Sequence, residues 1–167
     1  MAEKDKIYSS KVKYAGIFDF SNFYKFCYEW LRDELGFTVA EDQYVEKIKG
    51  DTKDVEFKWT ATKKVTDYFK FEVKVDYRVL GLKKVEVVQN NAKVKTNEGS
   101  VDVKCGGTLI RDYDAKFETN AFQKFMRAIY EKWIIASRIA DYEDKLAGNC
   151  DEFLAQVKAY LDLEGKK

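Results

Sequence analysis

The spacing of apolar residues changes several times along the chain, and each change marks the boundary of a predicted element. In residues 12–18 every second position, including Val12, Tyr14 and Phe18, falls on one side, which predicts a short strand with one largely apolar face. Apolar residues then recur at steps of three and four, which predicts an amphipathic helix that starts after an N-cap at Asp19 or Ser21 and ends at Gly36. The stripe of this helix consists of Phe20, Phe23, Tyr24, Cys27, Trp30, Leu31 and Leu35.

A period of two returns after this helix and continues through the middle of the chain. In 55–62 and 69–79 one side is apolar and the other is largely charged, so the pattern predicts an antiparallel sheet with one face open to solvent. Gly81 is predicted to end a strand, and turns are predicted at Asn90-Asn91 and at 97–99. The predicted strands lie at 37–49, 55–62, 69–79, 85–87, around 94 and at 101–105.

Two consecutive glycines, Gly106 and Gly107, fall inside the last predicted strand. Glycines in a strand are typical of a bend or a bulge, and also of a place where a ligand approaches the backbone closely. We favour the bend here and keep the ligand as the alternative.

Helical spacing returns after Thr119 and predicts a long helix that ends near Leu146, before Gly148-Asn149. A second, shorter helix is predicted from Cys150 to Leu161. The chain shows no repeat or linker, so residues 1–167 are predicted to form one domain with frayed ends at 1–10 and 165–167.

The order of these elements predicts an α+β fold. It consists of a curved antiparallel sheet of five to seven strands, a strand and a helix before it, a long C-terminal helix packed on one face, and a short terminal helix. Over residues 12–146 this order resembles the helix-grip arrangement of the START and Bet v 1-like proteins. The chain departs from that pattern in lacking the glycine-rich loop of the plant members and in carrying the extra helix. The resemblance implies a ligand cavity between the sheet and the long helix.

Four short segments are similar to parts of uncharacterised archaeal proteins of comparable length, and this similarity implies no activity. The segments are 67–71, 80–82, 94–96 and 111–114.

The amino-acid composition excludes several classes of catalytic and metal site. The chain has no histidine, which excludes serine and cysteine relays that use an imidazole, as well as HExxH zinc sites. Its three cysteines, Cys27, Cys105 and Cys150, are far apart and form no CxxC pair, so they are expected to be reduced core residues. We therefore expect neither a metal site nor any other cofactor.

The net charge and the hydropathy of the chain indicate which binding partners and which cellular compartment to expect. Lysine and arginine number 30 against 29 acidic residues, a net charge of +1, so no nucleic-acid partner is expected. No apolar run is long enough for a membrane span, and the polar N-terminal segment does not resemble a signal peptide. These features together favour a cytoplasmic protein.

One set of apolar and aromatic residues is predicted to lie between the sheet and the long helix. These residues line a ligand pocket if the space is open and form an ordinary close-packed core if it is filled, which is the interpretation that we favour. Tyr77, Arg111 and Tyr113 are candidate polar contacts for a ligand. The pocket candidates are Phe57, Trp59, Phe69, Phe71, Tyr77, Met126, Ile129 and Trp133.

A second candidate site is a partner surface on the predicted long helix. Tyr130, Ile134 and Ile135 widen its apolar sector enough to contact either a second chain or the terminal helix. Acidic pairs such as Asp112 with Asp114 have no flanking motif. We therefore interpret them as part of a solvated surface and not as a catalytic or Mg²⁺ site.

The sequence therefore predicts a non-enzymatic binding domain. It is expected to bind either another protein chain, including a second copy, or a small apolar molecule. A helix-grip carrier of a lipid-like ligand, or a cyclase-like enzyme with a carboxylate or tyrosine acid and base, is the alternative.

Overall fold

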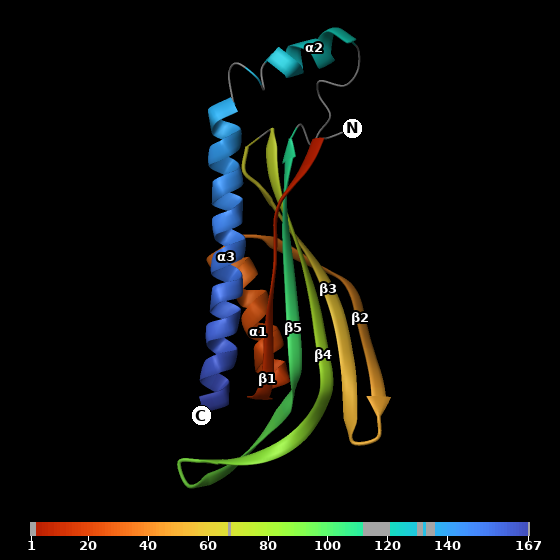
Figure 1. The fold of residues 1–167 in the computed structure, drawn as a ribbon, viewed down its shortest axis with the longest axis vertical. Helices are drawn as coiled ribbons and strands as arrows, with labels where there is room; N and C mark the ends of the chain where they lie inside the picture. Colours follow the sequence, from red (N-terminus) through yellow and green to blue (C-terminus); the bar gives the residue numbers. More distant parts are fainter. Residues whose placement is uncertain (1–2, 67, 112–120, 130–131, 133–135, 167) are drawn as a thin grey trace.

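A computed structural model describes residues 3–66, 68–111, 121–129, 132 and 136–166. These residues form an α+β fold, in which an open five-stranded antiparallel sheet carries helices on one face (Figure 1). The predicted fold class is thus confirmed. The elements are β1 (Glu3–Phe18), α1 (Phe20–Glu29), η1 (Trp30–Glu34), β2 (Thr38–Lys49), β3 (Thr52–Lys64), β4 (Phe69–Gln89), β5 (Ala92–Arg111), α2 (Ala121–Ile129) and α3 (Ala136–Lys166).

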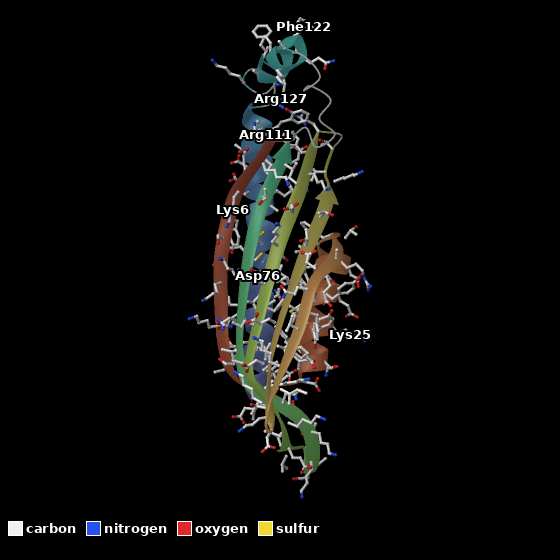
Figure 2. All side chains as sticks on the ribbon, turned by 90° about the vertical axis from the view of Figure 1, so that its right-hand side faces the viewer. Lys6, Lys25, Asp76, Arg111, Phe122 and Arg127 are labelled. Atoms are coloured by element: carbon white, nitrogen blue, oxygen red, sulfur yellow. The ribbon has the colours of Figure 1, made fainter. Side chains whose placement is uncertain are left out.

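The strand order in the sheet is β1-β5-β4-β3-β2, so the first strand of the chain pairs with the last. Helix α3 packs against β1 and β5, and α1 lies beside it on the same face of the sheet (Figure 1). The opposite face carries charged side chains that point to solvent (Figure 2). This arrangement leaves α2 beyond the end of the sheet, away from the face that α1 and α3 cover (Figure 1).

Local sequence explains the two ends of the first helical segment. The side chain of Asp19 accepts a hydrogen bond from the backbone N–H of Asn22 at 3.1 Å, which confirms the predicted N-cap. After the π-helical turn η1, Gly36 adopts a φ of 75°, a left-handed conformation that glycine reaches without steric cost. The backbone N–H of Phe37 then donates to the carbonyl of Leu31 at 2.9 Å and closes the segment.

The strands are longer than the alternation predicted. Residues 3–10 pair with β5 instead of fraying, so β1 begins well before residue 12. Gly81 does not end β4, because its positive φ accommodates a register shift between Leu80 and Lys83 and the pairing with β5 resumes beyond it. The turn predicted at 97–99 is also wrong, since β5 is continuous there, whereas the turn at Asn90-Asn91 is confirmed.

The predicted break at Gly148-Asn149 is wrong, because α3 runs through both residues. The buried stripe of the segment predicted as a short terminal helix continues that of Leu146 without interruption. Burial of this stripe on the sheet outweighs the roughly 1 kcal/mol that a glycine costs inside a helix. The residues on this stripe are Leu146, Cys150, Phe153, Leu154, Val157 and Leu161.

Candidate functional site

The predicted pocket residues of β3 and β4 all lie in the core. Phe57, Trp59, Phe69, Phe71 and Tyr77 point toward the helices and are at most 3% exposed. Phe57 and Tyr77 stack with their ring centroids 4.2 Å apart, and Trp59 meets Tyr77 edge to face at 4.8 Å. Rings at these separations are in direct contact, which supports the filled-core interpretation.

Different helices cover different members of this group of buried aromatic residues. Tyr24 of α1 packs against Phe57 with a centroid separation of 5.1 Å, whereas Tyr142 of α3 packs against Phe69 at 4.7 Å. The structure therefore divides the predicted pocket residues between two helix contacts along the sheet.

The remaining pocket candidates do not join the buried rings. Met126 and Ile129 belong to α2, where Met126 is 42% exposed and Ile129 is half-buried. The other residues predicted for the pocket or the partner surface lie outside the described part of the chain. They are Tyr113, Tyr130, Trp133, Ile134 and Ile135.

Arg111 is described, and its guanidinium pairs with the carboxylate of Asp5 at 2.8 Å. This ion pair links the end of β5 to the start of β1. Arg111 therefore has a structural contact that the sequence did not suggest.

Tyr77 carries a buried polar group inside the core. Its hydroxyl lies next to the Cys27 thiol, but no hydrogen bond of normal geometry reaches it from the described residues. Burial raises the pKa of Tyr77 well above its ordinary value, so the phenol stays protonated at neutral pH. Burial raises the pKa of the Cys27 thiol in the same way, which makes it a poor nucleophile.

A polar cluster that the sequence did not predict joins α1 to the edge strand β2. The indole Nε1 of Trp59 donates to Oε2 of Glu41 at 3.0 Å, and the hydroxyl of Tyr24 donates to the same oxygen. Burial and this hydrogen bond raise the pKa of Tyr24 to about 12. Tyr24 is thus a hydrogen-bond donor at neutral pH and not a general base, which gives the cluster a structural role.

Helix α2 presents the largest apolar side chains that the structure leaves exposed close together. Phe122 is 70% exposed, Phe125 61% and Met126 42%. Their spacing of i, i+3 and i+4 places them on one face of the helix. Large exposed apolar patches on a helix are typical of sites that contact another molecule.

Two of the three polar residues of α2 lie on its more buried side, whereas Lys124 is exposed. Gln123 and Arg127, one turn apart, are half-buried. Figure 2 shows Arg127 on the side of α2 that faces the sheet, with Phe122 on the far side. The helix is therefore oriented opposite to a typical surface helix, which buries its apolar face and exposes its polar one.

The charge of α2 has one sign. Its sequence from Ala121 to Ile129 contains Lys124 and Arg127 and no acidic residue. The exposed apolar face is thus bordered by positive charge.

Within the described ranges, no three carboxylate or thiol side chains are grouped so that they would hold a metal ion. Among these same residues, no helix combines the length and the apolar character that crossing a membrane requires.

Comparison with family models, with curated proteins and with solved structures gives no match to this chain.

Proposed function

We propose that this protein is an interaction module and that α2 is the helix through which it docks. The partner is a protein with an apolar groove that has an acidic rim. The observation that carries this proposal is the exposure of Phe122, Phe125 and Met126 on one face of α2, while the face with Gln123 and Arg127 is half-buried.

The spacing supports recognition by a groove. An amphipathic helix that binds in a groove uses anchors at i, i+3, i+4 and i+7. In α2 these positions are Phe122, Phe125, Met126 and Ile129. Phenylalanine and methionine are enriched at the centres of protein interfaces, so the helix has suitable anchor residues.

The position of α2 supports the same role. The inner face of the sheet is already covered by α1 and α3, and α2 lies beyond the sheet's end (Figure 1). A helix at this place can enter a groove without any change in the core.

Charge and length favour a protein over a lipid surface. The described helix has nine residues and two basic side chains, one of which faces the chain itself. Stable attachment to a membrane surface needs a larger apolar area or a cluster of basic residues. A groove with acidic residues at its rim instead complements both the anchors and Lys124.

Photo-cross-linking in the source cells tests this proposal. Benzoylphenylalanine replaces Phe125 in one variant and Val88 in a matched control, because Val88 is 71% exposed but lies on β4, away from α2. We expect one adduct with a different protein from position 125 and none from position 88. The additional substitution Phe122→Ser is expected to abolish the adduct.

The cross-linked protein is then purified and titrated with the full chain. We expect Phe125→Ser to weaken binding by at least about tenfold and Val88→Ser by less than about twofold, because anchors carry most of the affinity of an interface. The proposal is contradicted if no adduct forms, if both positions give the same adducts, or if the adduct is a lipid or a second copy of this chain. Equal binding of the two serine variants also contradicts it.

A further inference from the structure

The open face of the sheet contains a hollow of about 420 Å³ on the side opposite α3. Figure 2 shows two of its lining residues, Lys6 on β1 and Asp76 on β4. The lining side chains come from three adjacent strands. They are Lys4, Lys6, Glu72, Lys74, Asp76, Lys104, Gly106 and Thr108.

Gly106 lies in this hollow, and its neighbour Gly107 points to the other face. A Cβ atom on Gly107 would lie 3.0 Å from Sγ of Cys150, so the close approach of α3 explains that glycine. A Cβ atom on Gly106 would make only ordinary contacts, the nearest at 3.7 Å to Cε of Lys6. The φ of Gly106 also lies outside the left-handed region.

Neither packing nor backbone conformation therefore requires a glycine at position 106. The predicted bulge lies next to it, where the pairing between β1 and β5 shifts between Lys6 and Tyr8, but Gly106 itself is regularly paired with Ser9 and Lys74. A glycine inside a strand weakens the strand and is otherwise typical of a place where a ligand approaches the backbone. The missing side chain keeps the hollow open.

The basic residues that line the hollow outnumber the acidic ones by four to two. Lysines on an edge strand such as β1 protect a sheet from pairing with other chains, but Lys74 and Lys104 lie on the inner strands β4 and β5. Lys74 is directly opposite Gly106 on one side and Thr60 on the other. Lys104 is directly opposite Lys11 on one side and Asp76 on the other, so one of its cross-strand neighbours has a like charge and the other an opposite charge.

We propose that this hollow is a binding site for a phosphorylated polyol, such as a sugar phosphate or the head group of a phosphoinositide. Lysine ammonium groups bind phosphate oxygens, and four of them surround the hollow. Glu72 and Asp76 accept hydrogen bonds from polyol hydroxyls, and the hydroxyl of Thr108 both donates and accepts.

The lining also argues against a nucleic acid as the ligand. Proteins that bind single strands stack the bases on aromatic rings, and the eight lining residues include none. The volume of the hollow falls in the range of small-molecule sites. This site lies on a different surface from the apolar face of α2, so the proposal for the site does not depend on the proposed docking function.

Isothermal titration calorimetry with fructose bisphosphate, at an ionic strength of about 0.15 M, tests the site in solution. We expect the wild-type protein to bind fructose bisphosphate and not fructose. The double variant Lys74→Gln/Lys104→Gln should bind it at least about tenfold more weakly, because it lacks two charge-assisted contacts. Lys13→Gln/Lys47→Gln is the charge-matched control, and both of its positions lie outside the lining.

The substitution Gly106→Val distinguishes an effect on ligand binding from an effect on the stability of the fold. Valine fills the hollow and favours a strand, so we expect it to weaken binding by about tenfold or more without lowering the unfolding temperature. Unchanged binding in Gly106→Val, or an equal loss in the charge-matched control, would overturn the proposal.

Vesicles of phosphatidylcholine, with and without a phosphatidylinositol bisphosphate, distinguish the two sources of the ligand. Sedimentation of the wild type with the phosphoinositide vesicles, and not of Gly106→Val, assigns the hollow to a lipid head group. Binding of the sugar bisphosphate alone assigns it to a free metabolite. The absence of binding in both assays overturns the site.

Discussion

Trp59 and Glu41 are joined by a hydrogen bond of 3.0 Å between the indole Nε1 and a carboxylate oxygen. Trp59 lies in the core on β3, and Glu41 lies on the edge strand β2. The same oxygen accepts a hydrogen bond from Tyr24 of α1, so one carboxylate connects the edge strand, the core and a helix. This side-chain contact adds to the backbone pairing of β2 with β3 and also ties β2 to α1.

Replacing Glu41 by alanine should destabilise the protein by about 1–3 kcal/mol, because two partly buried donors lose their acceptor. Urea unfolding measures this loss. Glu86→Ala on β4 is the control, since Glu86 is an exposed glutamate whose replacement should change stability by less than about 0.5 kcal/mol. Equal effects of the two substitutions would contradict the role given to Glu41.

Tyr24 gives the fold a specific dependence on alkaline pH. Its pKa is about 12 in the folded protein, above the ordinary value of 10, so folding favours the protonated phenol. Its contribution to stability is therefore complete below pH 10 and is lost as the pH rises from 10 toward 12. Comparison of wild type and Tyr24→Phe by denaturant unfolding at several alkaline pH values should show a smaller loss in the variant. Parallel curves would contradict this assignment.

Tyr77→Phe should leave the stability unchanged or raise it by up to about 1 kcal/mol, because the substitution removes a buried hydroxyl that lacks a normal hydrogen bond. Phe57→Ala provides the contrast, since deletion of the ring stacked on Tyr77 should cost about 3–5 kcal/mol. Chemical denaturation compares the two variants. A loss above about 1 kcal/mol in Tyr77→Phe would show that the hydroxyl stabilises the fold.

Gly148→Ala should stabilise the protein by about 0.5–1 kcal/mol, because alanine is the better helix former and position 148 lies inside the continuous helix α3. Apart from the backbone of the helix itself and the two chain neighbours, no atom lies within 4 Å of the added Cβ. Thermal unfolding with far-ultraviolet circular dichroism measures the change. A lower unfolding temperature would instead support the helix break that the sequence predicted at this position.

The sequence predicts elements well where the local signal and the packing agree. Asp19 and Gly36 mark the ends of the first helical segment because their roles depend on nearby backbone atoms. By contrast, Gly81 and Gly148 each look like the end of an element in the local sequence. Strand β4 nevertheless continues past Gly81 because it pairs with β5, and helix α3 continues past Gly148 because it packs on the sheet. Such long-range contacts are not visible in the spacing of residues.

The same limit applies to the candidate sites. The helical spacing of Phe122, Phe125 and Met126 is plain in the sequence, but the direction in which that stripe points is set by the placement of α2. The spacing therefore predicts Met126 between the sheet and the long helix, whereas the structure exposes it. Gly106 was recognised as a possible ligand position, but its lysine neighbours from β1 and β4 become visible only through the strand register.

Docking through α2 requires that its apolar face is free in the isolated protein. The free energy of unfolding of the double variant Phe122→Ser/Phe125→Ser, determined with urea at constant pH, tests this requirement. Because both side chains are mostly exposed, we expect a change of less than about 1 kcal/mol. A loss of several kcal/mol, as for the removal of core rings, would show that the apolar face of α2 packs against its own chain and would contradict the proposed docking role.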